Sequence, residues 1–63
     1  MMKAGQKIRV KAYGGEELVR VVLEEGDSYV VICREEEFIK AKSTGRTPQG
    51  VGFSKEFVIG LVE

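Results

Sequence analysis

Residues 17–33 read ELVRVVLEEGDSYVVIC, two apolar runs separated by a short polar turn. The first run is rich in valine, whose branched side chain favours strands, and the second run is a continuous apolar segment of strand length. Gly26 and Asp27, between the runs, are turn formers. The pattern therefore predicts two strands, at 17–24 and 29–33, that are apolar on both faces.

Three further segments have the character of strands. From Lys7 to Ala12 charged and apolar residues alternate, which is typical of a strand with one buried face. The pair Gly14-Gly15 follows, where positive φ angles allow a tight turn. Near the other end, apolar runs at 51–53 and 57–62 flank the polar residues 54–56. These runs predict a fourth and a fifth strand joined by one tight turn.

Residues 34–44 differ from the rest of the chain because they are good helix formers. Acidic residues come first and basic residues last, the order that the helix dipole favours. Gly45 stands where a glycine often ends a helix. We expect a short helix here that covers one face of the sheet. A β-hairpin arm through residues 37–42 is the alternative.

Length and composition favour one small globular domain over residues 1–63. The chain is 43% hydrophobic and 32% charged with a net charge of zero, which is too apolar for a disordered segment. One cysteine and no histidine exclude an internal disulfide and a histidine- or cysteine-based metal site. Residues 1–6 lack the apolar core of a signal peptide, and no run reaches the roughly 20 apolar residues of a membrane span. We expect a cytoplasmic protein.

The segment Gly52-Phe53-Ser54-Lys55-Glu56-Phe57-Val58 resembles the link between the last two strands of SH3 domains, which runs small-aromatic-Pro-x-x-Tyr-Val. The opening strands are similar to those of Tudor-like and KOW-like small barrels. The resemblance implies a mainly β fold, a five-stranded SH3-like barrel with a short helix inserted between strands three and four. Residues 36–58 are also similar to small uncharacterised bacterial proteins, a likeness that implies no function.

Two departures from the SH3 pattern affect the ligand. The chain has no tryptophan, and Ser54 stands where the motif has proline. Of the aromatic residues that line the SH3 groove, only Tyr13 and Phe57 stand at matching positions. Because a polyproline helix docks on a row of flat rings, these departures argue against a proline-rich ligand.

The sequence predicts no catalytic site, cofactor or metal site. Nucleophilic catalysis needs a base beside the nucleophile, and the chain has no histidine. Cys33 ends an apolar strand, where a thiol behaves as a small hydrophobe. Gly14-Gly15 lacks the lysine and the helix of a phosphate-binding loop. We expect a protein that is not an enzyme and has no small-molecule substrate; an enzyme active only as an oligomer is the alternative.

The two-sided apolar strands suggest a protein contact. The outer face of the second and third strands carries more apolar side chains than one short helix can cover, and uncovered patches of this kind mark interfaces. The predicted interface residues are Leu18, Val22, Tyr29 and Val31. We expect the partner to be another protein or a second copy of this chain, which would make a homo-oligomer.

Clustered charge gives a second hypothesis, weak binding of nucleic acid. Residues 1–11 carry four positive charges and residues 38–55 carry four more, whereas residues 12–37 carry eight acids against two arginines. If the two basic segments lie on one side, they form a stripe with Tyr13 or Phe53 nearby for base stacking. The stripe residues are Lys7, Arg9, Lys11, Lys42 and Arg46.

Overall fold

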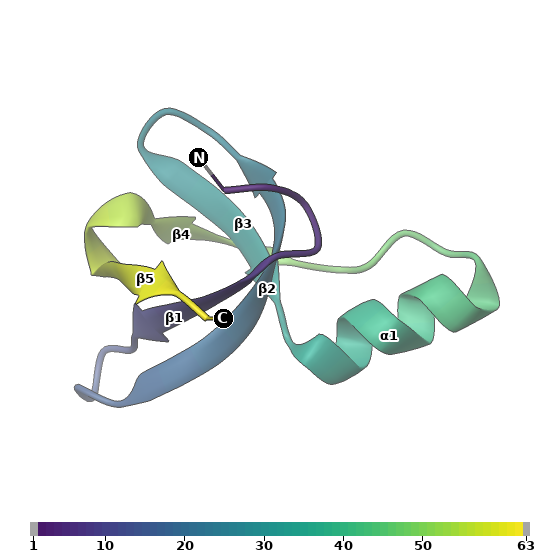
Figure 1. Cartoon of the computed structure of the whole chain (residues 1–63), viewed down its shortest axis with the longest axis horizontal. Coiled ribbons are helices and arrows are strands. Elements are labelled where there is room, and N and C mark those ends of the chain that lie inside the picture. Colours follow the sequence, from purple (N-terminus) through teal and green to yellow (C-terminus); the bar gives the residue numbers. More distant parts are fainter. Residues whose placement is uncertain (1, 63) are drawn as a thin grey trace.

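The computed structural model describes residues 2–62, shown in Figure 1. Its elements are β1 (Lys7–Lys11), β2 (Glu17–Glu25), β3 (Tyr29–Cys33), α1 (Glu35–Thr44), β4 (Val51–Ser54), the 3₁₀ helix η1 (Lys55–Phe57) and β5 (Val58–Leu61). The predicted strands and the helix between the third and the fourth strand are confirmed. The alternative hairpin arm at residues 37–42 is not formed, because this segment is helical.

All five strands belong to one antiparallel sheet, in the order β4-β3-β2-β1-β5. The edges of the sheet are β4 and β5, which are consecutive in the chain and are joined by η1. Figure 1 shows how strongly the sheet curls, which brings the two edge strands to the same side of the molecule. The fold is therefore mainly β, as predicted, but the hydrogen-bonded sheet is not closed into a barrel.

The core lies on the inner face of the curled sheet. Its fully buried side chains are Ile8, Val10, Val22, Val30 and Ile32. Half-buried Met2, Leu18, Phe53 and Val58 pack around them. Burial of one such aliphatic side chain contributes about 1.5–3 kcal/mol. This cluster, drawn from all five strands, is what holds the sheet in its curl.

The helix α1 projects from the sheet instead of lying flat on it (Figure 1). Only Ala41 of this helix is fully buried, while Ile39 remains exposed. The helix is capped by Gly45, whose φ of 71° is left-handed, so that the N–H groups of Gly45 and Arg46 donate to the carbonyls of Lys42 and Ala41. The predicted glycine cap is thus confirmed.

The loop from α1 back to β4 is held by one carboxylate. The Arg46 guanidinium donates to both oxygens of Glu37, at 2.6 and 3.1 Å, and the Gln49 N–H donates to the same carboxylate at 3.1 Å. The Arg46 hydrogen bonds and then the Gln49 hydrogen bond lower the pKa of Glu37 to about 2. Close to β4 the loop lies on the sheet: a Cβ added at Gly50 would stand 2.7 Å from a methyl group of Leu23.

Candidate functional site: an aromatic pocket

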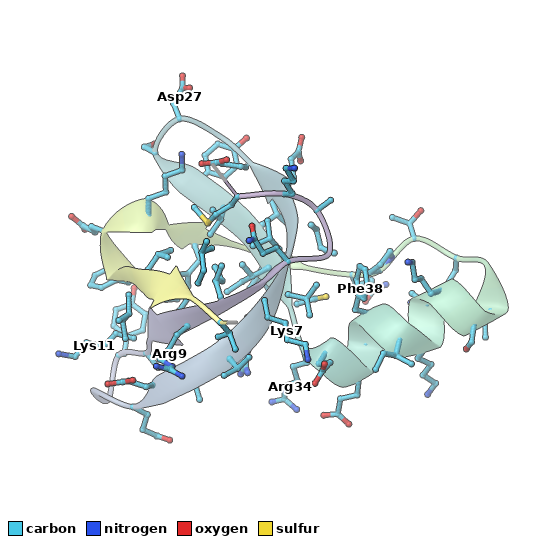
Figure 2. All side chains as sticks on the ribbon, in the orientation of Figure 1. Lys7, Arg9, Lys11, Asp27, Arg34 and Phe38 are labelled. Atoms are coloured by element: carbon cyan, nitrogen blue, oxygen red, sulfur yellow. The ribbon has the colours of Figure 1, made fainter. Side chains whose placement is uncertain are left out.

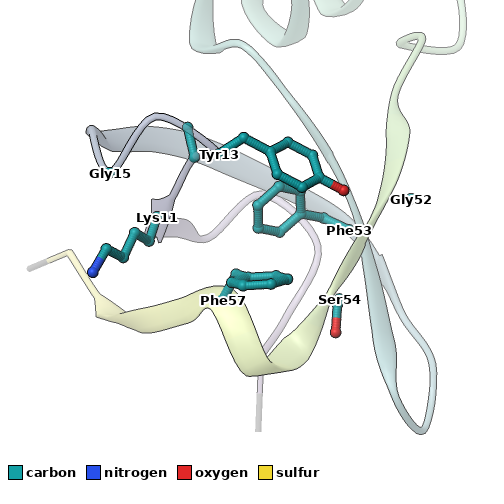
Figure 3. A pocket seen from close by; sticks show the side chains of 8 residues that line it. Lys11, Tyr13, Gly15, Gly52, Phe53, Ser54 and Phe57 are labelled. Carbon is teal, nitrogen blue, oxygen red and sulfur yellow. The ribbon is translucent and has the colours of Figure 1, made fainter.

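An open pocket lies between the β1–β2 turn, the edge strand β4 and η1 (Figure 3). Its volume is about 380 Å³, at the lower end of the range for ligand pockets, which is roughly 300–1,000 Å³. Its lining residues are Lys11, Ala12, Tyr13, Gly15, Gly52, Phe53, Ser54 and Phe57. The pocket therefore has room for one or two side chains of a bound chain, or for one flat ring.

Three aromatic rings give the pocket its character. The chain has two tyrosines and three phenylalanines, and Tyr13, Phe53 and Phe57 meet here. The ring centroids of Tyr13 and Phe57 are 6.5 Å apart, and those of Phe53 and Phe57 are 5.9 Å apart with an edge-to-face tilt. Tyr13 is fully exposed and Phe57 is 41% exposed. These two rings thus present apolar surface that the fold itself does not cover.

Local backbone structure fixes the positions of the rings. The turn that carries Tyr13 is closed by two hydrogen bonds, from Ala12 N–H to the carbonyl of Glu16 at 2.8 Å and from Gly15 N–H to the carbonyl of Ala12 at 2.9 Å. Gly15 has a φ of 85°, which only glycine adopts at low cost. On the other side, the single turn of η1 directs Phe57 toward Phe53, as Figure 3 shows.

The charge at the pocket is one lysine. Lys11 is its only charged lining residue and makes no ion pair among residues 2–62. The nearby Lys55 is already paired, because its ammonium lies 2.7 Å from the carboxylate of Glu25. That ammonium lowers the pKa of Glu25 through its hydrogen bond. The pocket is therefore apolar with one free cation at its rim.

The predicted apolar interface residues do not share a face. Val22 is 0% exposed in the core, and Leu18 packs against the same core. Val31 lies on the opposite face, where a Cβ added at Gly50 would stand 2.9 Å from it. Tyr29 is 46% exposed, on the same face as Val31. The expectation of one exposed outer patch was wrong, because the inner face of the curled sheet takes up Leu18 and Val22.

The predicted basic stripe is also dispersed. Lys7 pairs with Glu35, Arg9 lies 3.9 Å from Glu17, and Arg46 lies 2.6 Å from Glu37. The ammonium of Lys42 stands 5.4 Å above the ring of Phe38.

In Figure 2, Lys11 lies at the end of the molecule opposite the C-terminal end of α1, which carries Lys42. Of the five predicted residues, only Lys11 reaches the aromatic pocket.

No family model, no curated protein and no solved structure matches this chain. Cys33 is buried, which raises the pKa of its thiol and keeps it in the unreactive protonated form. Within residues 2–62, no three histidine, cysteine or acidic residues lie close enough to hold a metal ion. The same range contains no helix that is both long and apolar enough for a membrane span.

Sequence reasoning found the parts of this pocket without assembling them. Tyr13 and Phe57 stood out by their positions in the SH3-like pattern, and Phe53 as a stacking residue. The three rings come together because β1 pairs with β5, which brings the turn after β1 close to η1. No local pattern encodes that pairing, so the sequence alone did not single out the pocket.

Proposed function

We propose that this protein is a non-enzymatic interaction module that holds a segment of a partner protein in the aromatic pocket. The observation that carries the proposal is the exposure of Tyr13 and Phe57 beside Phe53 in one pocket. Exposed tyrosine and phenylalanine rings supply large contact areas at small entropic cost, and they are enriched at protein interfaces. The pocket offers rings and one cation, and no pair of groups suited to acid–base chemistry.

An SH3-like relationship is part of the proposal. The strand order β4-β3-β2-β1-β5 and the single 3₁₀ turn between the last two strands support it. Phe57 ends that turn, where the SH3 pattern has its tyrosine. The pocket thus lies where the resemblance leads us to expect ligand contact.

Selection from a library of random peptides displayed on phage tests the proposal. Enriched peptides should bind the wild type and should lose binding to Tyr13→Ala and Phe57→Ala, because each change removes a ring from the pocket. The matched control is Tyr29→Ala, which removes an exposed ring outside the pocket. Equal loss with all three variants, or no enrichment on the wild type, would contradict the proposal.

Nucleic acid is the second candidate ligand. The observation that favours it is the free ammonium of Lys11 beside the exposed ring of Tyr13, a pairing suited to a phosphate and its base. Fluorescence anisotropy with oligo-uridine and oligo-thymidine across a salt series tests this candidate. Binding that weakens as salt rises and disappears in Lys11→Gln supports it. No binding at low salt excludes it.

Self-association is a further part of the proposal, on a surface other than the predicted one. Val19 and Ile39 are exposed apolar residues that line one open groove between β2 and α1. Sedimentation equilibrium at micromolar protein concentrations measures the oligomeric state. A dimer that dissociates in Ile39→Lys would locate the contact at this groove, and a monomer at all concentrations would exclude it.

A further inference from the structure

We infer that the partner segment binds in an extended form and adds a strand to the outer edge of β4. This inference rests on the proposed function, because it states how the ligand of the aromatic pocket is held. The alternative for the same pocket is docking through side chains alone, without backbone pairing. Strand addition needs unpaired backbone N–H and C=O groups at the edge of the sheet, whereas docking through side chains needs only the pocket.

The outer edge of β4 is open. The strand pairs with β3 on one side, with Phe53 facing Val30 and Gly52 facing Val31. On the other side, no strand among residues 2–62 pairs with β4, since it is the last strand in the sheet order. Open edges offer a row of unpaired N–H and C=O groups that template the pairing of another chain. β4 is such a template.

The register identifies which groups point outward. The N–H of Lys55, directly after β4, donates to the carbonyl of Ser28 at 3.0 Å, on the β3 side. In a strand, the N–H and C=O groups of successive residues point to opposite sides. The peptide groups of Ser54 and Gly52 therefore point away from β3. Both of these residues line the aromatic pocket, so the open edge and the pocket belong to one surface.

Gly52 makes this edge accessible. A Cβ added there would meet no atom within 4 Å, so the face of the sheet at Gly52 is open and no side chain covers its backbone. Its φ is not left-handed, and no turn or close packing in this structure requires a glycine. Glycine inside a strand often marks a place where another backbone approaches closely. We assign that role to Gly52.

The edge is short, with four residues, but its sequence carries no group that repels an added strand. Lysine, proline and inward-pointing charges are the usual means of preventing strand addition. The four residues of β4 are Val51, Gly52, Phe53 and Ser54, none of which is charged or proline. Val51 is an exposed apolar residue at the start of the strand. A partner strand would meet no repulsive group along β4.

The chemistry of the surface describes the partner. It is an extended segment whose alternate side chains face the pocket, because side chains alternate along a strand. One of them is aromatic or branched aliphatic and packs among Tyr13, Phe53 and Phe57. An acidic side chain beside it meets the free ammonium of Lys11. Proline is absent from the pairing positions, since it has no N–H to donate.

The variant Ser54→Pro separates strand addition from docking by side chains. Ser54 has a φ of −67°, which is the value that the proline ring imposes. Its N–H points outward and has no partner among residues 2–62. Proline therefore fits the fold and removes one donor from the open edge. The matched control is Ser54→Ala, which removes the hydroxyl and keeps the N–H.

The probe is the most enriched peptide from the phage library, synthesised with a fluorophore. We expect Ser54→Pro to weaken its binding about tenfold, which corresponds to the loss of one backbone hydrogen bond. Ser54→Ala should change the affinity by less than about twofold, because it keeps that bond. Hydrogen exchange at the amides of Gly52 and Ser54 should slow when the peptide binds the wild type.

Three results would overturn the inference. One is unchanged binding to Ser54→Pro combined with lost binding to Phe57→Ala. That result would keep the pocket as the binding site and exclude strand addition as the binding mode. Another is enrichment of proline-rich peptides. The third is measured on the wild type, in case Ser54→Pro fails to fold: peptides N-methylated at each position in turn would all bind as well as the parent peptide. If Phe57→Ala also binds normally, the proposed function itself fails.

Discussion

The curled sheet and the helix α1 are held in place by different forces. The sheet encloses five fully buried aliphatic side chains, whereas α1 buries only Ala41. Two ion pairs add to this small apolar contact: Glu35 pairs with Lys7 of β1, and Glu37 pairs with Arg46 in the loop that follows the helix. Burial of one such aliphatic side chain contributes about 1.5–3 kcal/mol, and an exposed ion pair contributes up to about 1 kcal/mol.

This difference in buried apolar contact leads us to expect a lower local stability for α1 than for the sheet. Regions with few buried apolar contacts open locally at a lower free energy than the core does. We therefore expect α1 to detach while the sheet stays folded. Substitutions in the two regions test this contrast, and the largest effect should come from the core.

Ile8→Ala should cause the largest loss of stability. Ile8 is fully buried, and truncation of a buried isoleucine to alanine costs about 2–5 kcal/mol because it leaves a cavity. A domain of this size has little stability to spare, so the variant should be close to unfolding at room temperature. Urea unfolding followed by circular dichroism measures the change. The control Ile59→Ala, at a side chain that is 51% exposed, should cost less than about 0.5 kcal/mol.

Ala41→Leu should weaken the docking of the helix by about 1–3 kcal/mol, since the larger side chain does not fit a filled site. Ala41 is fully buried. Native-state hydrogen exchange should show faster exchange in α1 and unchanged exchange in β1 and β2. Lys40→Leu, at the exposed neighbour, serves as the control. Equal acceleration in the helix and the sheet would mean that they unfold as one unit.

Gly45→Ala should cost about 1 kcal/mol, because it forces a side chain into the left-handed region at the end of the helix. Gly45 has a φ of 71°, and a Cβ there would meet no atom within 4 Å, so backbone strain is the whole effect. The control is Gly60→Ala, where the Cβ also meets open space and φ is not left-handed. A larger loss at Gly60 than at Gly45, in thermal unfolding, would contradict this explanation.

Glu37→Gln should have the smallest effect on the free energy of unfolding, and the effect should depend on pH. The pKa of Glu37 falls from 4.5 to about 2 when the chain folds, chiefly through its hydrogen bonds with Arg46. The stabilisation by this carboxylate is therefore full above pH 4.5 and is lost as the pH falls toward 2. Unfolding free energies across this range should decrease more steeply for the wild type than for Glu37→Gln.

The control for this experiment is Glu36→Gln, since Glu36 forms no ion pair among residues 2–62. Its pH profile should follow that of the wild type. If Glu37→Gln also follows the wild type, then the carboxylate does not hold the loop. Added salt should reduce the difference, because the Glu37–Arg46 pair is partly exposed.

Local patterns in the sequence predicted the elements well. The strand expected at 29–33 has those bounds, the strands expected at 7–12 and 17–24 differ by one residue, and the helix ends at Gly45 as expected. Alternation, turn glycines and helix formers act over a few residues, so they can be read directly. Closure of the sheet into a barrel was also expected, and the structure has an open sheet instead.

Faces and sites were harder to predict for a physical reason. Alternation shows that Leu18 and Val22 share a face, but it does not show that this face curls inward. Phe53 and Val58, more than thirty residues further along the chain, help to fill that inner side. The pocket likewise combines a turn near residue 13 with a turn near residue 57. Long-range pairing decides both, and composition and spacing contain little information about it.

The segment between β3 and β4 leaves the sheet and returns to it at one point. Ile32 faces Val51 across the two strands, so the chain enters and exits the helical excursion through neighbouring positions. A two-residue hairpin turn could bridge that gap as well as the whole helix does. The segment is therefore an insertion that the pairing of β3 with β4 does not require, and we expect changes in its length or an attached reporter group to leave the aromatic pocket at the far end of β4 unchanged.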